Sequence, residues 1–142
     1  LFPYTTLFRS VYYSHFSYVA QVAEVQVKNG KPQVTQVTAV TDCGEVVNLS
    51  GAENQVKGAI IDGMGHAMFA KLNIQAGVTS PTNFNAYRMI RGNEVPKIDA
   101  YFVDNGISPT GLGEPALPPT GGSIANAIYA ATKKRFYKQP FY

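Results

Sequence analysis

The chain has 142 residues, 45% of them hydrophobic and 15% charged, so it is long enough for one packed core and too apolar to remain disordered. Its net charge is +3, but no nucleic-acid recognition motif accompanies the basic residues, and we expect no nucleic-acid partner. The single cysteine excludes an intrachain disulfide and a cysteine-based metal site, and no apolar run approaches the roughly 18 residues that a membrane span needs.

Residues 1–10 fit neither the rest of the chain nor the layout of a secretory signal peptide, which needs an apolar core and a small-residue cleavage site. We interpret them as a foreign leader that comes from cloning or sequence assembly. A native strand is the alternative, and the sequence does not decide between the two. Residues 11–142 then form a single domain.

Residues 12–40 predict a β-hairpin. The run 12–27 is rich in β-branched and aromatic residues, and residues 33–40 repeat this character. Asn29 and Gly30 lie between the two runs, and both tolerate the positive φ that the tightest hairpin turns require. We assign this hairpin a structural role.

Residues 41–48 connect the hairpin to a long helix, which we expect over residues 50–72. Ser50 and Glu53 have the spacing of a capping box. Apolar residues then recur at helical spacing: Val56, Ile60, Met64 and Ala67. Cys43, in the connection, has no histidine near it in the sequence, so we expect a small buried thiol rather than a nucleophile.

Three glycines interrupt this helix, and each costs about 1 kcal/mol relative to alanine. We expect Gly63 and Gly65 to allow close packing of the helix against the sheet. For Gly58 two interpretations stay open: close packing, or access of a cofactor to the backbone.

Residues 75–103 predict extended structure with turns, and residues 95–103 alternate as a strand does. A loop rich in glycine and proline follows, residues 111–119. Pro115 keeps Glu114 out of helical geometry, so the loop is expected to be rigid and to present one carboxylate from a defined place.

A second, short helix is expected after this loop, with Ser123 as its N-cap and the basic residues 133–135 in its last turn. The expected fold class is therefore α+β. It consists of a β-hairpin and further strands packed against a long glycine-containing helix and a short C-terminal helix.

Several segments of the chain resemble one known family. They are Gly-x-Gly-Glu-Pro-x-x-Pro-Pro at 111–119, Ile-Ala-Asn-Ala-Ile at 124–128, Asp-Cys-Gly at 42–44, Gln-x-x-Gly at 55–58 and Asn-Phe-x-x-Tyr-Arg at 83–88. Together they resemble the C-terminal end of the molybdenum-binding large subunit of the xanthine dehydrogenase and aldehyde oxidase family. The isoquinoline 1-oxidoreductase type is the branch of nearest likeness. The resemblance runs from about Val11 to the end of the chain.

The resemblance implies a molybdenum–molybdopterin cofactor, shared with an upstream domain that this chain lacks. Glu114 would be the general base, and Gln55, Gly58 and Gly113 would contact the cofactor. No side chain would ligate the metal, because the pterin holds it. On the residues alone, Gln55 would be an exposed helix glutamine and Glu114 a solvated loop acid. The resemblance instead implies a carboxylate buried beside an apolar substrate pocket.

The implied activity is oxidation of an aldehyde or an aromatic N-heterocycle, with oxygen taken from water. The implied partners are the upstream remainder of the large subunit, a small iron–sulfur subunit and a small-molecule substrate, so the 142-residue chain alone is expected to be inactive. The alternative is a non-catalytic α+β interaction module that docks through the glycine- and proline-rich loop. The compartment, cytoplasmic or periplasmic in a bacterium, stays open.

Overall fold

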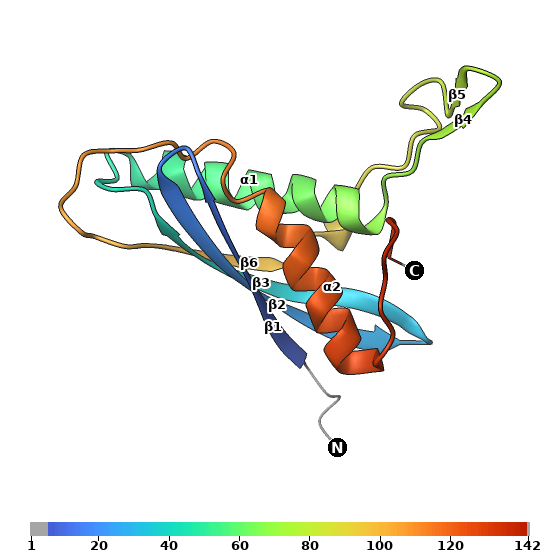
Figure 1. Cartoon of the computed structure of the whole chain (residues 1–142), viewed down its shortest axis with the longest axis horizontal. Coiled ribbons are helices and arrows are strands. Elements are labelled where there is room, and N and C mark those ends of the chain that lie inside the picture. The colour runs from blue at the N-terminus through green and yellow to red at the C-terminus, as the bar shows by residue number, and fades with distance from the viewer. Residues whose placement is uncertain (1–5, 142) are drawn as a thin grey trace.

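The computed structural model describes residues 6–141 (Figure 1). Its main sheet has the strand order β1-β2-β3-β6. These strands are β1 (Thr6–Ser14), β2 (Ser17–Lys28), β3 (Lys31–Asp42) and β6 (Lys97–Phe102). Two helices, α1 (Leu49–Met68) and α2 (Pro118–Thr132), pack against one face of this sheet. The expected α+β class is confirmed.

Strands β2 and β3 form the predicted hairpin. They pair antiparallel, and the turn residues Asn29 and Gly30 have φ values of 52° and 74°. Strand β6, by contrast, pairs with β3 in parallel, so α1 lies within the crossover between two neighbouring parallel strands. The segments that follow β3 and β6 therefore leave the sheet at the same edge.

A second hairpin joins β1 to β2 and was missed by the sequence analysis, which treated residues 12–27 as one β-rich run. Its turn consists of His15 and Phe16, both with positive φ (55° and 61°). Phenylalanine rarely adopts such a conformation, so the sequence carries no turn signal here.

Helix α1 begins one residue earlier and ends four residues earlier than expected. Asn48, not Ser50, is the N-cap, because its Oδ1 accepts a hydrogen bond from the backbone N–H of Gly51 (2.9 Å). The expected capping box is therefore wrong, and Glu53 instead forms an ion pair with Lys57 (2.7 Å). The helix ends at Met68 because the chain from residue 71 to 80 is exposed and offers no apolar face for another turn.

Helix α2 begins at Pro118, before the predicted N-cap Ser123. Proline suits the first turn of a helix, since its missing N–H would have no partner there. Ser123 lies within the helix, buried, and its hydroxyl donates to the carbonyl of Thr120 (2.9 Å). Lys133 has a φ of 61° and is the C-cap, so the basic residues 133–135 follow the last turn rather than lie in it.

Between α1 and β6 the chain forms a small exposed hairpin that projects from the body of the molecule (Figure 1). The hairpin consists of β4 (Asn73–Gln75) and β5 (Val78–Ser80), and it turns at Ala76 and Gly77 as the glycine predicts. One 3-10 turn, η1 (Gly92–Glu94), precedes β6.

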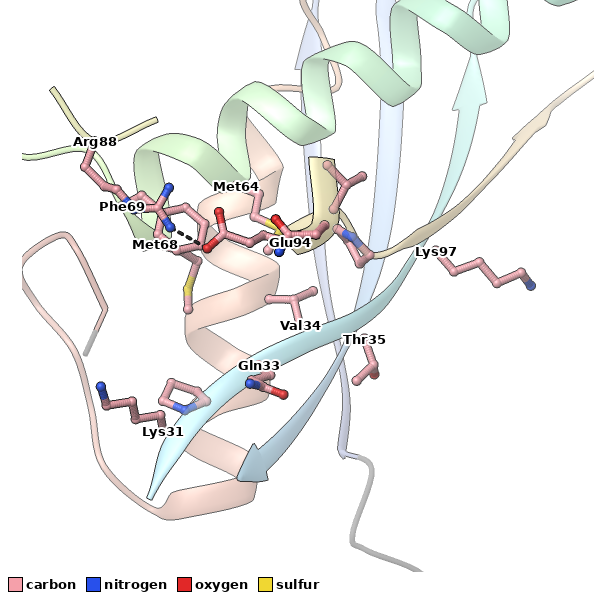
Figure 2. Close-up of a pocket in the computed structure, with 14 residues that line it drawn as sticks. Lys31, Gln33, Val34, Thr35, Met64, Met68, Phe69, Arg88, Glu94 and Lys97 are labelled. Atoms are coloured by element: carbon pink, nitrogen blue, oxygen red, sulfur yellow. Dashed lines mark hydrogen bonds and ion pairs between the residues drawn. The ribbon is translucent and has the colours of Figure 1, made fainter. Parts of the chain in front are cut away.

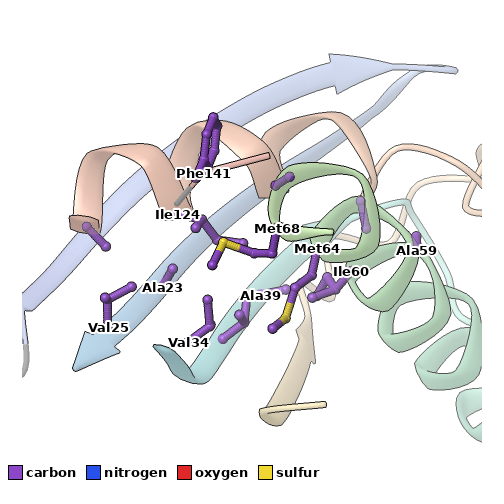
Figure 3. Close-up of a cluster of buried hydrophobic side chains, with 14 of the residues drawn as sticks. Ala23, Val25, Val34, Ala39, Ala59, Ile60, Met64, Met68, Ile124 and Phe141 are labelled. Carbon is purple, nitrogen blue, oxygen red and sulfur yellow. The ribbon is translucent and has the colours of Figure 1, made fainter. Parts of the chain in front are cut away.

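The core lies between the two helices and the sheet (Figure 3). The predicted apolar stripe of α1 is buried, and it meets Ile124 and Ile128 of α2. Near the C-terminus, Phe141 closes the core, and its backbone N–H donates to the carbonyl of Ala67 (2.9 Å). Burial of this apolar surface holds the helices in place.

Part of the suspected leader, residues 6–10, lies in β1 and pairs with β2, while residues 1–5 lie outside the described residues. This pairing does not reveal the origin of the segment, so a foreign leader stays a prediction. Within residues 6–141, neither helix is long and apolar enough to cross a membrane.

Candidate functional site

The connections that follow β3 and β6 lie side by side at one edge of the sheet. The backbone N–H of Thr110 donates to the carbonyl of Cys43 (2.9 Å). Gly44 permits this approach, since its φ is +70° and an added Cβ would lie 2.3 Å from the carbonyl oxygen of Ser108. Ligands of open α/β sheets bind outside the carboxyl ends of the strands, so this edge is a candidate ligand site.

The acidic loop, residues 111–117, is held against the β1–β2 turn. The backbone N–H of Gly111 donates to the carbonyl of His15 (3.0 Å), and the Ser17 hydroxyl donates to the carbonyl of Gly111. Ser17 also shares a hydrogen bond with the hydroxyl of Thr110 (2.7 Å). A Cβ atom at residue 111 would lie 2.4 Å from the Cβ of His15, so only glycine fits there.

Gln21, fully buried in β2, holds the other end of the acidic loop. Its amide donates to the carbonyl of Ala116, and its side-chain carbonyl accepts from the hydroxyl of Thr120 (3.0 Å). A buried amide is costly unless it is hydrogen-bonded, and here both of its ends have partners. Sequence analysis missed Gln21, although its parity with the buried Val19 and Val25 was a signal.

Replacing Gln21 by leucine is expected to lower the free energy of unfolding by about 1–3 kcal/mol, because two buried hydrogen bonds are lost, although the Thr120 hydroxyl can still donate to the Ala116 carbonyl (3.0 Å). Urea unfolding of the full-length protein measures this change. The control Gln33→Leu alters an exposed glutamine and should have little effect. Equal stability of Gln21→Leu and the wild type would show that the amide does not hold the loop.

Glu114 lies on the exposed side of the acidic loop. Its side chain is 81% exposed, and one carboxylate oxygen lies 3.7 Å from Nε2 of His15. The expected burial beside an apolar substrate pocket is wrong for this chain. The neighbours Pro115 and Ala116 are buried instead, and a turn closed by a hydrogen bond from Leu117 N–H to the Glu114 carbonyl (3.0 Å) leaves the carboxylate outside.

Gln55 lies in the second turn of α1, which begins at Leu49. Its side chain is exposed and lines a shallow depression of about 290 Å³. Thr110 and Leu112 line the same depression from the opposite segment. The structure therefore brings Gln55 beside the start of the acidic loop, whereas Glu114 follows Leu112 by two residues and does not line this depression.

The glycines separate into two groups. Gly63 does pack closely, but against the start of α2 and not against the sheet as predicted, since an added Cβ would lie 2.8 Å from the carbonyl oxygen of Leu117. At Gly65 an added Cβ would make only an ordinary contact of 3.5 Å, so close packing is not required there. Gly58 and Gly113 are exposed, and a Cβ at either would have nothing within 4 Å. No described residue accounts for these two.

Cys43 is a buried free thiol, as predicted. Burial, and to a smaller extent the neighbouring carboxylate of Asp42, raises the pKa of this thiol above its ordinary value. A raised pKa reduces the thiolate fraction, which is the nucleophilic form, so a structural role fits this cysteine.

A cavity of about 670 Å³ lies at the other end of α1 (Figure 2). Met64, Met68 and Phe69 line it together with β3 and the start of β6. The guanidinium of Arg88 lies over the Phe69 ring, 4.3 Å from its centroid. Arg88 also forms an ion pair with Glu94, and its hydrogen bond to the Glu94 carboxylate lowers the pKa of that carboxyl. None of the predicted site residues lines this cavity.

The family model for the molybdopterin cofactor-binding domain matches residues 4–96, more than half of the chain. The chain belongs to this family. The chain also resembles individual proteins of known activity. It is 34% identical over 121 residues to membrane-bound aldehyde dehydrogenase [pyrroloquinoline-quinone] of Gluconacetobacter polyoxogenes, covering 84% of this chain and 16% of that protein. It is 29% identical over 126 residues to isoquinoline 1-oxidoreductase subunit beta of Brevundimonas diminuta, covering 87% and 16%.

A solved aldehyde oxidoreductase from Desulfovibrio desulfuricans has the same fold as the molybdopterin cofactor-binding chain, with a TM-score of 0.77 and 23% identity over 87% of this chain and 14% of that one. The family expected from the sequence motifs is thus confirmed, with the isoquinoline type among the relatives. The chain spans about a sixth of the length of the curated relatives named above.

The residues at the depression fit the cofactor of this family. The exposed Gln55 amide offers both a donor and an acceptor for the edge of a pterin. Gly58 and Gly113 do not line the depression, and a Cβ at either would have no neighbour within 4 Å, so their backbone is open to an approaching group. Among residues 6–141 no group of three or more histidine, cysteine, aspartate or glutamate side chains could hold a metal ion.

Proposed function

We propose that this chain is the C-terminal cofactor-binding part of the large subunit of a molybdenum hydroxylase. The substrate would be an aldehyde or an aromatic N-heterocycle, and the oxygen would come from water. The relatives named above are an aldehyde dehydrogenase and an isoquinoline oxidoreductase, which motivates this substrate class. A further large-subunit domain and an iron–sulfur partner would complete the enzyme, and the chain alone would be inactive.

The observation that carries the proposal is the meeting of Gln55 and the acidic loop around one depression at the carboxyl ends of two parallel strands. Gln55 would donate to and accept from the pterin through its amide. Gly58 and Gly113 would let the cofactor approach the backbone. The cofactor would supply the oxidising chemistry, taking electrons from the substrate.

Glu114 would act as the general base, taking up a proton at a carboxylate oxygen while the substrate carbon is oxidised. A general base must be ionised at the working pH and within hydrogen-bond reach of its proton. The carboxylate is accessible, 81% exposed, and the loop behind it is fixed at both ends by hydrogen bonds to Gly111 and from Gln21. The upstream part of the subunit would cover this side and complete the substrate pocket.

Metal and pterin analysis of the full-length protein, purified with its neighbouring subunits, tests this proposal. Molybdenum and pterin in a ratio near one per large subunit would support it. A complete assembly that contains neither would contradict it, and pyrroloquinoline quinone in their place would point to the cofactor printed in the name of one relative.

The substitution Gly58→Ala is expected to have opposite effects on the stability of α1 and on cofactor binding. Gly58 is exposed in the interior of α1, so Gly58→Ala should raise helix stability by about 1 kcal/mol. If the cofactor approaches the backbone here, the same substitution should lower the molybdenum content of the purified protein. The matched control is Gly65→Ala on the same helix, which should keep its molybdenum. Full molybdenum content in Gly58→Ala would remove Gly58 from the cofactor site.

One observation favours the alternative, a non-catalytic interaction module. The Glu114 side chain is largely exposed, as expected for a solvated loop acid at a docking edge. The molybdenum and pterin content of a complete assembly distinguishes the two functions. A hydroxylase would contain both, and an interaction module would contain neither.

A further inference from the structure

We propose that His15 is a positioning residue for Glu114. This inference rests on the proposed function, in which Glu114 is the general base. It concerns a residue of the β1–β2 turn that belongs to none of the motifs of the cofactor-binding family described above.

The imidazole ring is held between two groups. The Ser14 hydroxyl lies 2.7 Å from Nδ1, and the Glu114 carboxylate lies 3.7 Å from Nε2. When the Ser14 hydroxyl donates to Nδ1 of the neutral ring, the proton of the ring sits on Nε2 and faces Glu114. When the ring is protonated, Nε2–H faces the carboxylate as part of a cation. In both states His15 presents a donor to Glu114.

The backbone beneath this pair is rigid. His15 and Phe16 both have positive φ, a conformation that costs free energy for residues other than glycine. Contacts with the acidic loop stabilise this turn. The backbone N–H of Gly111 donates to the His15 carbonyl, and the Cβ of His15 packs so closely on Gly111 that no side chain would fit at residue 111. Strained residues of this kind cluster at functional sites, which motivates a functional role for the turn.

The pair itself contributes little to folding. The side chains of His15 and Glu114 are 54% and 81% exposed, and ion pairs at such positions are weakened by water and salt. Among the described residues, Glu114 is the one charged group within 4 Å of this ring. Two other titratable groups on the strands of the turn, Tyr13 and Tyr18, stack on each other with centroids 4.6 Å apart. The contact between His15 and Glu114 therefore adds little stability, and a role in orienting the Glu114 carboxylate accounts for it better.

Three variants of the full-length enzyme test the inference. His15→Asn keeps a residue that tolerates positive φ but is too short to reach Glu114. His15→Gln keeps the reach and an N–H donor but cannot be protonated. The matched control, Phe16→Asn, changes the next residue of the same turn, which is exposed. Molybdenum content and Tm are measured for each variant.

His15→Asn is expected to lower kcat about tenfold with KM changed less than about twofold, since a misplaced general base affects the chemical step. His15→Gln should recover most of this loss. Phe16→Asn should behave as the wild type.

Wild-type kcat in His15→Asn would overturn the inference, and so would an equal loss in Phe16→Asn, which would mean that the turn matters and the imidazole does not. A loss in His15→Asn that glutamine does not rescue would also overturn it. Failure of the proposed function would give a different result, because Glu114→Gln itself would then keep its turnover.

Discussion

Replacing Glu114 by glutamine in the full-length enzyme is expected to lower kcat by a factor of about one hundred to ten thousand. This is the range that a general base contributes, and glutamine keeps the size of the side chain while it removes the ability to take up a proton. Steady-state turnover with an aromatic N-heterocycle or an aldehyde measures the loss. KM should change little, because the substitution affects the chemical step.

Stability and cofactor content should be unchanged in Glu114→Gln, since the side chain is 81% exposed and makes no buried hydrogen bond. Asp104→Asn is the matched control. It neutralises another exposed acid in the same connection between β6 and α2, and it should keep wild-type turnover. Near-normal turnover in Glu114→Gln would refute the role of Glu114, whatever the cofactor.

Alanine at residue 111 should have the second large effect, because a Cβ atom there would lie 2.4 Å from the Cβ of His15 and 3.1 Å from its carbonyl oxygen. The acidic loop must then move away from the β1–β2 turn. We expect the free energy of unfolding to fall by about 1–3 kcal/mol, as overpacking usually costs. We expect kcat to fall by about a hundredfold, the cost of displacing a catalytic group by about 1 Å.

Urea unfolding and steady-state kinetics of the full-length enzyme measure these two effects. Gly92→Ala is the control, since an added Cβ there would have nothing within 4 Å. If Gly111→Ala kept both the stability and the turnover of the wild type, the close contact between turn and loop would have no role in holding Glu114.

The elements that the sequence predicts well are those with local signals. Asn29 and Gly30 encode their hairpin turn directly, and the apolar stripe of α1 encodes its buried face. Gly63 was expected to pack closely against the sheet, and it packs closely against the start of α2 instead. In each case the residue type favours one local structure at its position.

The errors concern choices that depend on the tertiary fold. Asn48 and Ser50 are both good N-caps, and their side chains alone do not decide which is used. Prolines at the start of α2 were interpreted as part of the loop, although the first turn of a helix accepts them. The turn at His15 and Phe16 is imposed by contacts with residues nearly a hundred positions away, so no local pattern predicts it.

For the site, the sequence motifs named candidate residues but did not predict their surroundings. Gln55 and the acidic loop do meet at one depression, across more than fifty residues of chain. The burial expected for Glu114 requires atoms that this chain does not supply, since the chain spans about a sixth of the relatives' length. No described neighbour accounts for Gly58 and Gly113, since a Cβ at either would have nothing within 4 Å.

The most direct measurement is an experimental structure of the full-length protein with its cofactor bound. The account predicts that the Gln55 amide lies within hydrogen-bond distance of the cofactor, and that the Glu114 carboxylate faces the same cofactor across a pocket closed by the upstream part of the subunit. A Glu114 side chain that still points into bulk water, with the cofactor elsewhere, would contradict it.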